Sequence, residues 1–263
     1  MPPMQRPAVL KSEDEVARTL HIVPTEPSTI DIRDEFISLA SHELKTPLTA
    51  LLLEVELQKR RLSRSQAGAL SAESIWQLMG TIDRHAWQLG KLIEDMLDSA
   101  KLSNGSMELE KKETDLKALI EAVAYRHDRE VISSGSRLEL DLQPYVLGHW
   151  DSERIEQVVS HLLLNAVKYG AGQPIRISLK QQEQNAQIKI IDQGMGIPAD
   201  SLERIFSRFE RAVPATHISG LGLGLFISRR IVEMHQGQIW AESHLQQGAT
   251  FTVVLPLNRE CAS

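Results

Sequence analysis

The chain has 263 residues, of which 42% are hydrophobic and 24% are charged, a balance typical of a globular protein with a buried core. Its formal net charge of -6 excludes the basic field that drives nucleic-acid binding. The single cysteine, Cys261, excludes an internal disulfide and a cysteine-cluster metal site. No apolar run approaches the ~18 residues of a membrane span, and the N-terminus lacks the apolar core of a signal peptide, so we expect a cytoplasmic protein.

The first part of the chain predicts a leader followed by two long helices. Five prolines within residues 1–30 indicate an irregular leader or linker. Apolar residues spaced by three and four predict helices over about 31–62 and 73–102, and Asn104-Gly105 ends the second. One hairpin buries two broad apolar stripes poorly, so we expect two copies to pair as a four-helix bundle in a homodimer. The alternative is that the hairpin packs on its own C-terminal domain.

From about Met107 the pattern changes to mixed helix and strand. We expect helices over 115–131, 152–169 and 223–235, with Asp115 as the N-cap of the first, and strands over 137–142, 175–179, 186–191, 237–243 and 248–255. The strands 175–179 and 186–191 are expected to form a hairpin. The predicted fold class is therefore α+β in two domains, with a sheet that carries helices on one face following the helical hairpin.

The first motif of chemical interest is FISLASHELKTPL, in the first long helix. His42 has Glu43 beside it and Thr46 one turn on. An unprotonated imidazole accepts a phosphoryl group, and an adjacent carboxylate holds the tautomer and takes the proton. The motif is not that of a zinc protease, because Thr46 replaces the second histidine of H-E-x-x-H. A His-Glu pair alone is more often an exposed helical histidine.

The second motif, HLLLNAVKY, places Asn165, Lys168 and Tyr169 within one helical turn. An amide oxygen ligates Mg²⁺, an ammonium binds phosphate and a ring packs on a base. The third motif, IIDQGMGIP, ends a strand with Asp192, which is suited to accept a hydrogen bond from an exocyclic amine. Gly194 and Gly196 allow a ligand to approach the backbone. Pro198 and the absence of a βαβ series exclude a dinucleotide-binding fingerprint.

The fourth motif, SGLGLGL, opens a helix with alternating glycines, whose free N–H groups bind phosphate oxygens. It lacks the Lys-Ser/Thr of a Walker P-loop. Between the third and fourth motifs lies IFSRFER, and the polar stretch that follows it, up to His217-Ile218, is expected to form a mobile flap over the nucleotide.

Together and in this order, the motifs resemble the transmitter core of two-component sensor histidine kinases. They correspond to the H, N, G1, F and G2 boxes of that family, and QGATF corresponds to its last G box. The resemblance implies a leader over 1–30, a dimerisation and histidine phosphotransfer domain over 31–104, a catalytic ATP-binding domain of the Bergerat α/β sandwich type over 107–258, and a tail over 259–263. It also implies Mg²⁺ and ATP as cofactors and the receiver domain of a response regulator as partner.

The resemblance assigns roles to individual residues. His42 would be the phosphoacceptor, Glu43 the assisting base, and Thr46 an orienting group for water if the protein also dephosphorylates its partner. Arg208 or Arg211 would reach the γ-phosphate or the partner. The nucleotide would be bound by Asn165 through Mg²⁺, by Lys168, Tyr169 and Asp192, and by a pocket and lid shaped by Gly194, Gly196, Gly220, Leu221, Gly222, Leu223, Gly224 and Thr250.

One position departs from the family pattern. His161 stands where the N box usually has a second asparagine, and histidine prefers softer metals than Mg²⁺. Two alternative functions therefore stay open. One is an ATPase of the gyrase or mismatch-repair type, against which the hairpin over 31–103 argues. The other is a degenerate kinase that acts as a scaffold or phosphatase, which only His161 supports. The stimulus, the identity of the regulator and cis versus trans phosphorylation are not predicted; we expect a fragment, or an input from a partner protein.

Overall fold

The computed structural model describes residues 29–64, 72–212 and 220–257. Most of the expected leader, most of the connection between the two long helices, most of the flap and the C-terminal tail lie outside these residues. The described residues from Leu39 onward belong to one compact unit.

Two long helices open the described part of the chain. Helix α1 spans Thr29–Arg64 and α2 spans Ala72–Ser103, which confirms the two predicted helices to within three residues at each end. Helix α2 ends as predicted: Gly105 has a φ of 66°, and Ser106 N donates to Lys101 O at 3.0 Å. This left-handed residue and backward hydrogen bond satisfy carbonyls at the end of the helix.

The remainder of the chain forms two sheets and four helices within the described residues. A five-stranded sheet has the order β2-β4-β5-β7-β6, in which only β2 and β4 run parallel, and a two-stranded antiparallel sheet pairs β1 with β3. The strands are β1 (Lys112–Asp115), β2 (Leu138–Leu142), β3 (Leu147–Trp150), β4 (Ile175–Gln182), β5 (Asn185–Ile191), β6 (Gln238–Ser243) and β7 (Ala249–Pro256). The helices are α3 (Leu116–Arg126), α4 (Asp128–Ser133), α5 (Ser152–Tyr169) and α6 (Gly224–Met234), and two 3₁₀ turns lie at Ala199–Ser201 and Arg204–Phe206.

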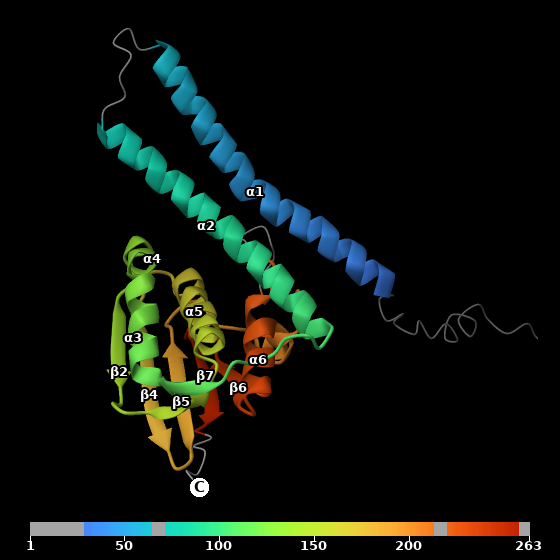
Figure 1. The fold of residues 1–263 in the computed structure, drawn as a ribbon, viewed down its shortest axis with the longest axis vertical. Helices are drawn as coiled ribbons and strands as arrows, with labels where there is room; N and C mark the ends of the chain where they lie inside the picture. The colour runs from blue at the N-terminus through green and yellow to red at the C-terminus, as the bar shows by residue number, and fades with distance from the viewer. Residues whose placement is uncertain (1–28, 65–71, 213–219, 258–263) are drawn as a thin grey trace, which may run out of the picture. The chain divides into compact units, whose positions relative to one another are not determined.

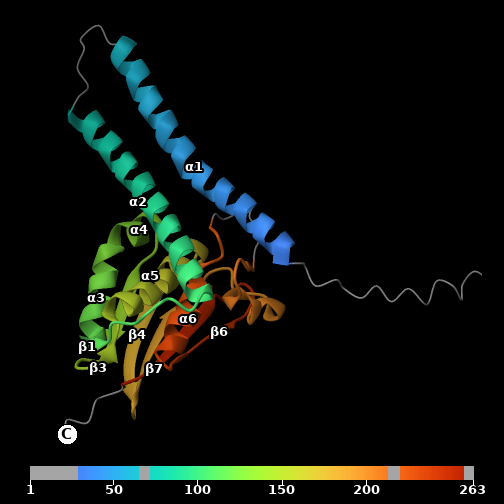
Figure 2. The ribbon, with the colours of Figure 1, turned by 45° about the vertical axis from the view of Figure 1, so that its right-hand side comes forward.

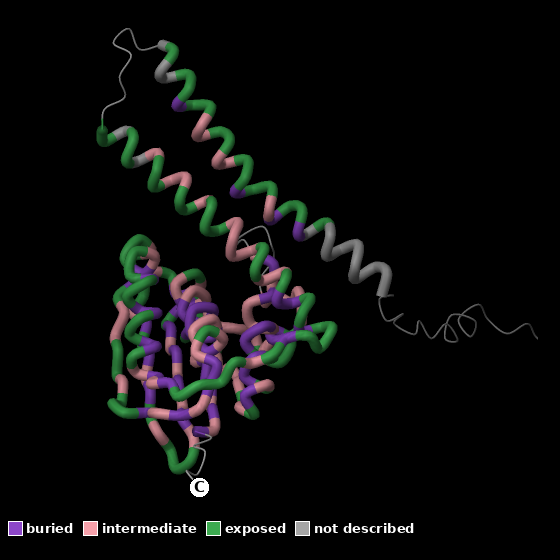
Figure 3. Tube along the Cα trace, viewed as in Figure 1, coloured by how far each residue is buried: buried purple, intermediate pink, exposed green. Residues whose placement is uncertain are grey.

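Helices α3, α5 and α6 cover one face of the five-stranded sheet (Figure 1), as the turned view also shows (Figure 2). The central strands β4 and β5 alternate between buried and more exposed residues, and β4 buries Ile175, Ile177 and Leu179 completely. This period of two turns one apolar face of the sheet toward the helices. The buried positions of α5 and of the strands are coloured purple in Figure 3. The core thus lies between the sheet and its helices, as the sequence predicted.

Several predicted elements are confirmed and others were missed. Helix α5 has the predicted bounds, and β4 and β5 form the predicted hairpin. The single helix predicted over 115–131 is wrong: the chain breaks at His127 into α3 and α4, although Asp115 is the N-cap as expected. The strands β1 and β3 were missed because each has only four residues and its pairing partner is distant in sequence.

A buried corner fixes the start of α5. Asp151 is the N-cap, and its Oδ1 accepts from Arg154 N at 3.1 Å while its Oδ2 accepts from Glu110 N at 2.9 Å. Its own N–H donates to His235 Nε2 at 3.0 Å, and His235 Nδ1 donates to Ile231 O at 2.8 Å. These two bonds fix His235 as the neutral Nδ1–H tautomer. The corner joins the start of α5 to the end of α6.

We predict that the His235 corner makes the fold sensitive to acid. Burial lowers the pKa of His235 below its ordinary value of 6.5. As the pH drops, His235 is therefore protonated in the unfolded chain before it is protonated in the folded chain. Its contribution to the free energy of unfolding is fully present above about pH 6.5 and decreases as the pH drops through that value. Urea unfolding at about pH 7 and pH 5 should show that the free energy of unfolding decreases less with acid in His235→Gln than in the wild type. It should also show a loss of about 1–3 kcal/mol at neutral pH, because a buried hydrogen bond is removed.

The exposed His244 provides the matched control, and His244→Gln should keep the wild-type dependence. Burial also lowers the pKa of His127. His127 therefore adds to the acid sensitivity of the fold, and it is present in every variant. An unchanged pH dependence in His235→Gln would contradict this assignment.

Candidate functional site

A cavity of about 260 Å³ lies where the C-terminal half of α5, the loop after β5 and the glycine loop before α6 meet. Eleven of the predicted site residues line it, and they come from four motifs, HLLLNAVKY, IIDQGMGIP, IFSRFER and SGLGLGL: Asn165, Lys168, Tyr169, Asp192, Gly196, Arg211, Gly220, Leu221, Gly222, Leu223 and Gly224. The fold thus brings the predicted amide, ammonium, carboxylate and glycine backbone to one place.

Helix α5 supplies the polar side chains at one end of the cavity. Lys168 Nζ lies 5.1 Å from the centroid of the Tyr169 ring. Although much of the Lys168 residue is exposed, its ammonium lies among cavity atoms, and this burial, with Arg211, lowers its pKa to about 8. The carboxylate of Glu43 acts in the opposite direction. An ammonium held beside another cation is a site for an anion.

Asp192 lies at the end of β5 and is only 5% exposed. Its Oδ1 accepts from Gly194 N at 2.9 Å, and its backbone N donates to Ala249 O at 2.9 Å. Burial raises the pKa of the carboxyl, whereas backbone hydrogen bonds from Gly194 and Ala249 act in the opposite direction. A buried carboxylate oxygen at a cavity wall is an acceptor for a ligand N–H.

The two glycines after Asp192 are required by close backbone contacts. A Cβ on Gly194 would lie 1.9 Å from Tyr169 O, and one on Gly196 would lie 2.1 Å from His244 O. Gly196 also has a φ of +70°, which L side chains rarely adopt. Gly194 does not line the cavity; instead it lets the strand end pack directly on the end of α5.

The glycine loop leads into α6 and presents its backbone to the cavity. Gly222 has a φ of +68°, and its carbonyl accepts from Phe209 N at 3.1 Å. Arg211 Nη1 donates to Gly220 O at 3.0 Å, and a Cβ on Gly220 would lie 3.0 Å from Lys168 Nζ. The loop therefore lies beside two cationic side chains, as a site for phosphate groups requires.

The residues of the first motif lie on α1, outside the cavity lining. His42 is exposed, and Thr46 Oγ1 donates to His42 O at 3.0 Å. Glu43 is only 8% exposed, and its Oε2 accepts from Gly220 N at 2.8 Å. The carboxylate next to His42 thus contacts the glycine loop.

Two further predicted residues also lie outside the lining. The Arg208 guanidinium lies 4.8 Å from the centroid of the Phe209 ring, and burial lowers its pKa. Thr250 lies on β7 opposite Ile191, and its neighbours Ala249 and Phe251 line the cavity in its place.

Sequence reasoning missed part of the cavity wall. The apolar wall includes Leu164, Met195, Ile197, Ile205, Leu225, Ala249 and Phe251, and three more lining residues, Lys91, Leu92 and Asp95, belong to α2. Hydrophobic periodicity places such residues in a core or on a helix face but does not say which of them border a cavity. His161, the departure from the family pattern, lines the cavity too and is 6% exposed.

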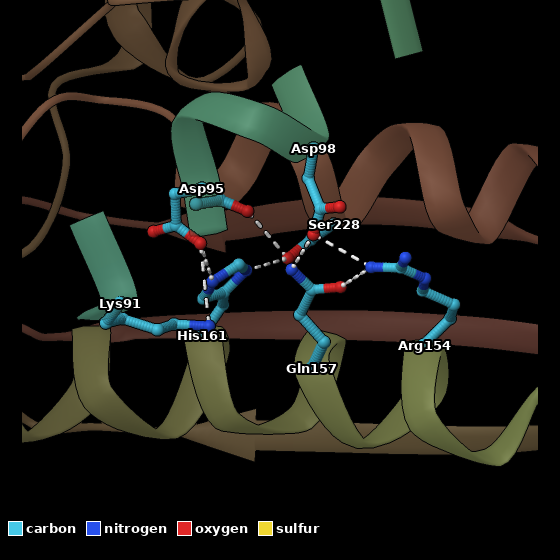
Figure 4. Close-up of polar contacts among 8 residues, drawn as sticks. Lys91, Asp95, Asp98, Arg154, Gln157, His161 and Ser228 are labelled. Carbon is cyan, nitrogen blue, oxygen red and sulfur yellow. Dashed lines mark hydrogen bonds and ion pairs between the residues drawn. The ribbon is translucent and has the colours of Figure 1, made fainter. Parts of the chain in front are cut away.

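His161 uses its ring nitrogens within the protein. Nε2 lies 3.1 Å from Asp95 Oδ1, and Nδ1 lies 3.4 Å from Ser228 Oγ (Figure 4). In the described part of the chain, no group of three or more His, Cys, Asp or Glu residues is arranged to hold a metal ion. The same residues include no helix with the length and apolar character needed to cross a membrane.

Comparisons with known proteins agree with this geometry. Residues 32–105 match the model of the His Kinase A (phospho-acceptor) domain, and residues 150–259 match that of the Histidine kinase-, DNA gyrase B-, and HSP90-like ATPase family. The adaptive-response sensory kinase SasA of Synechococcus sp. (strain JA-3-3Ab) is 34% identical over 266 residues, which cover 99% of this chain and 69% of SasA. The sensor protein kinase WalK of Staphylococcus aureus is 31% identical over 244 residues, which cover 90% of this chain and 57% of WalK.

The structural comparison leads to the same family. The Acinetobacter baumannii histidine kinase AdeS has a TM-score of 0.59 and 25% identity, over 83% of this chain and 98% of that one. The phospho-acceptor and ATPase models match two successive parts of the chain, and all lining residues of the cavity except Lys91, Leu92 and Asp95 belong to the second part. The chain belongs to the sensor histidine kinases of two-component systems and contains the transmitter core of that family.

Proposed function

We propose that the chain is an ATP-dependent protein histidine kinase that phosphorylates His42 and then passes the phosphoryl group to an aspartate on the receiver domain of a response regulator. The observation that supports this best is the cavity itself. It combines a buried carboxylate acceptor, a glycine loop and two cationic side chains. Most of its lining residues lie in the part of the chain that matches the ATPase family model. The domains would extend over 31–104 and 107–258.

The two ends of the cavity suit the two ends of ATP. The Asp192 carboxylate accepts from the exocyclic amine of adenine, and the apolar wall packs on the base. At the other end, the backbone N–H groups of the glycine loop and the Lys168 and Arg211 side chains bind the phosphates. This division matches the ligand chemistry, because an apolar base and a multiply charged chain need opposite surroundings.

Asn165 is the proposed ligand for Mg²⁺. Its amide oxygen is a hard donor of the kind that Mg²⁺ prefers, and it lines the cavity one turn before Lys168. His161 does not fit this role, because both of its ring nitrogens have protein partners. When bound, Mg²⁺ neutralises charge on the phosphates.

The reaction forms a nitrogen–phosphorus bond and breaks the bond between the γ-phosphorus and the bridging oxygen of ATP. An imidazole nitrogen of His42 attacks in line, and ADP leaves with the electron pair of the broken bond. Glu43 accepts the proton from the other ring nitrogen. Lys168, Arg211 and the glycine loop stabilise the charge on the phosphoryl oxygens as it develops.

Transfer to an aspartate then regenerates His42, because the acyl phosphate forms as the nitrogen–phosphorus bond breaks. A phosphatase role toward the same regulator, with Thr46 orienting water, is a further part of the proposal. The gyrase-type ATPase alternative is disfavoured, because residues 32–105 match a phospho-acceptor domain.

We predict that ATP labelled on its γ-phosphorus transfers its label to the wild-type chain. The labelled bond should be acid-labile and alkali-stable, as a phosphoramidate is. His42→Gln should lose the label by at least about a hundredfold, because glutamine has no nucleophilic nitrogen lone pair. The same variant should bind ATP as the wild type does. Release of phosphate without labelled protein would indicate an ATPase instead, and absence of nucleotide binding would indicate a scaffold.

We also propose that the chain is a homodimer that forms through the helical hairpin. Large apolar side chains on α1 and α2 are exposed in the single chain, and these include Leu48, Leu52, Leu53, Leu57, Ile75, Trp76, Met79 and Trp87. Two adjacent apolar faces of this size are stabilised when a second hairpin covers them.

Light scattering should therefore give twice the 29.5 kDa mass of one chain. Leu53→Asp combined with Leu57→Asp should shift the mass to that of a monomer, because two charges would be buried in the bundle. Glu56→Lys changes an exposed polar residue of the same helix and should leave the dimer intact. A monomeric wild type would contradict the proposal.

A further inference from the structure

Helix α2 contacts α5 through two acidic side chains one turn apart. Asp98 Oδ2 accepts from Arg154 Nη1 at 2.8 Å and from Gln157 Nε2 at 2.7 Å, and Asp95 Oδ1 lies 3.1 Å from His161 Nε2. Figure 4 shows Asp95 and Asp98 on α2 pointing toward the three α5 side chains. We call Asp95 and Asp98 the acidic face of α2, and Arg154, Gln157 and His161 the docking surface of α5.

The two surfaces match in spacing and in hydrogen bonding. Residues 154, 157 and 161 follow each other by three and four, so they lie on one side of α5. The side chains of Asp98 and His161 are 10% and 5% exposed, so water screens their contacts little. Breaking such a pair leaves a buried charge without its partner, which makes the contact specific.

Both ring nitrogens of His161 have partners in this arrangement. Nε2 lies 3.1 Å from Asp95 Oδ1, and Nδ1 lies 3.4 Å from Ser228 Oγ, whose hydroxyl donates to Gly224 O at 2.7 Å. Burial favours the neutral acid of Asp95, but the hydrogen bond and charge of His161, with Lys91, hold its pKa below the ordinary value. Asp95 is thus an anion that contacts His161, and both ring nitrogens of His161 are engaged within the protein.

The same contacts close the phosphate end of the cavity. Lys91 and Asp95 of α2 line it together with His161 and Asn165. On the other side, Glu43 occupies the N–H of Gly220, a donor that would otherwise bind a phosphate oxygen. Carboxylates of the hairpin therefore lie where the anionic part of a nucleotide would bind.

We propose that the docking surface of α5 binds the acidic face of α2, and that this docking competes with ATP for the phosphate end of the cavity. The inference rests on the proposed nucleotide binding. A nucleotide that binds only the undocked chain has its affinity reduced by the undocked fraction. His161 therefore acts as a docking residue at a position where the family pattern has a metal ligand.

The test exchanges the charges of one contact outside the cavity. Asp98 and Arg154 do not line the cavity, so a change in ATP affinity must come through docking. D98R, R154D and the double variant D98R/R154D are made in the full chain with His42→Gln, which prevents turnover. Calorimetry with Mg–ATP should show about fivefold or tighter binding for each single variant, because docking is lost, and affinity within about twofold of the parent for the double variant.

Matched controls carry the same charge changes elsewhere. D83R alters an exposed residue of α2, and R176D alters an exposed residue of β4; neither should change ATP affinity. Unchanged or weaker binding in both single variants, or a double variant that does not return toward the parent, would overturn the proposal. If circular dichroism shows that D98R is unfolded, the isosteric D98N replaces it and should also bind ATP more tightly.

Hydrogen exchange provides a readout that needs no nucleotide. Amides over residues 91–101 of α2 should exchange faster in each single variant and return to the parent rate in the double variant. Equal exchange in all variants would exclude the docking surface. If no variant binds ATP, the proposed function and the competition both fail, while the exchange rates still decide whether α2 docks on α5.

Discussion

The register of α5 is the constraint on which the rest of the structure depends. One side of this helix is buried on the sheet by fully or almost fully enclosed residues such as Ile155, Leu162 and Ala166. A second stripe carries Arg154, Gln157 and His161, followed by Asn165 and Lys168, all spaced by three and four. A rotation of the helix would move every one of these polar groups at once. The buried corner between Asp151 and His235 fixes where the stripe begins.

This stripe of α5 both borders the cavity and contacts α2. Its C-terminal part borders the cavity, and its N-terminal part receives the acidic face of α2. His161 belongs to both parts, because it lines the cavity and also contacts Asp95. Occupation of the cavity and docking of the hairpin are therefore linked through adjacent turns of one rigid element. In the proposed kinase, this link would connect the phosphoacceptor helices to the state of the nucleotide site.

Much of the fold could be predicted because its strongest patterns are local. Helix α5 has an N-cap, a clear apolar stripe and a glycine directly after it, and its predicted bounds are correct. The hairpin of β4 and β5 follows from alternation and a polar turn. The paired strands β1 and β3 were missed because pairing between residues 112–115 and 147–150 depends on tertiary contacts and not on the local sequence. The break at His127 was missed because no glycine or proline marks it.

The residues of the candidate site that would face a ligand could be predicted from the sequence. The residues of α2 that complete the cavity wall could not. Asp192 and the glycines are visible in the sequence, since a strand that ends in an acid and glycines suits close contact with a ligand. The contribution of α2 was not visible, because Lys91 and Asp95 are ordinary polar residues of an exposed-looking helix face. The role of His161 could not be predicted either, because it follows from contacts with Asp95 and Ser228, which are distant in sequence.

The proposed function depends on recognition of an adenine nucleotide by Asp192, and the claim that Asp192 binds the base can be measured directly. Calorimetry of the His42→Gln chain should show ATP binding at least about tenfold tighter than GTP binding, because guanine presents a carbonyl oxygen to the carboxylate where adenine presents an amine. Asp192→Asn should weaken ATP binding and remove most of this preference, while the exposed Asp200→Asn should leave both affinities unchanged. Equal binding of ATP by Asp192→Asn and by its parent would contradict the claim.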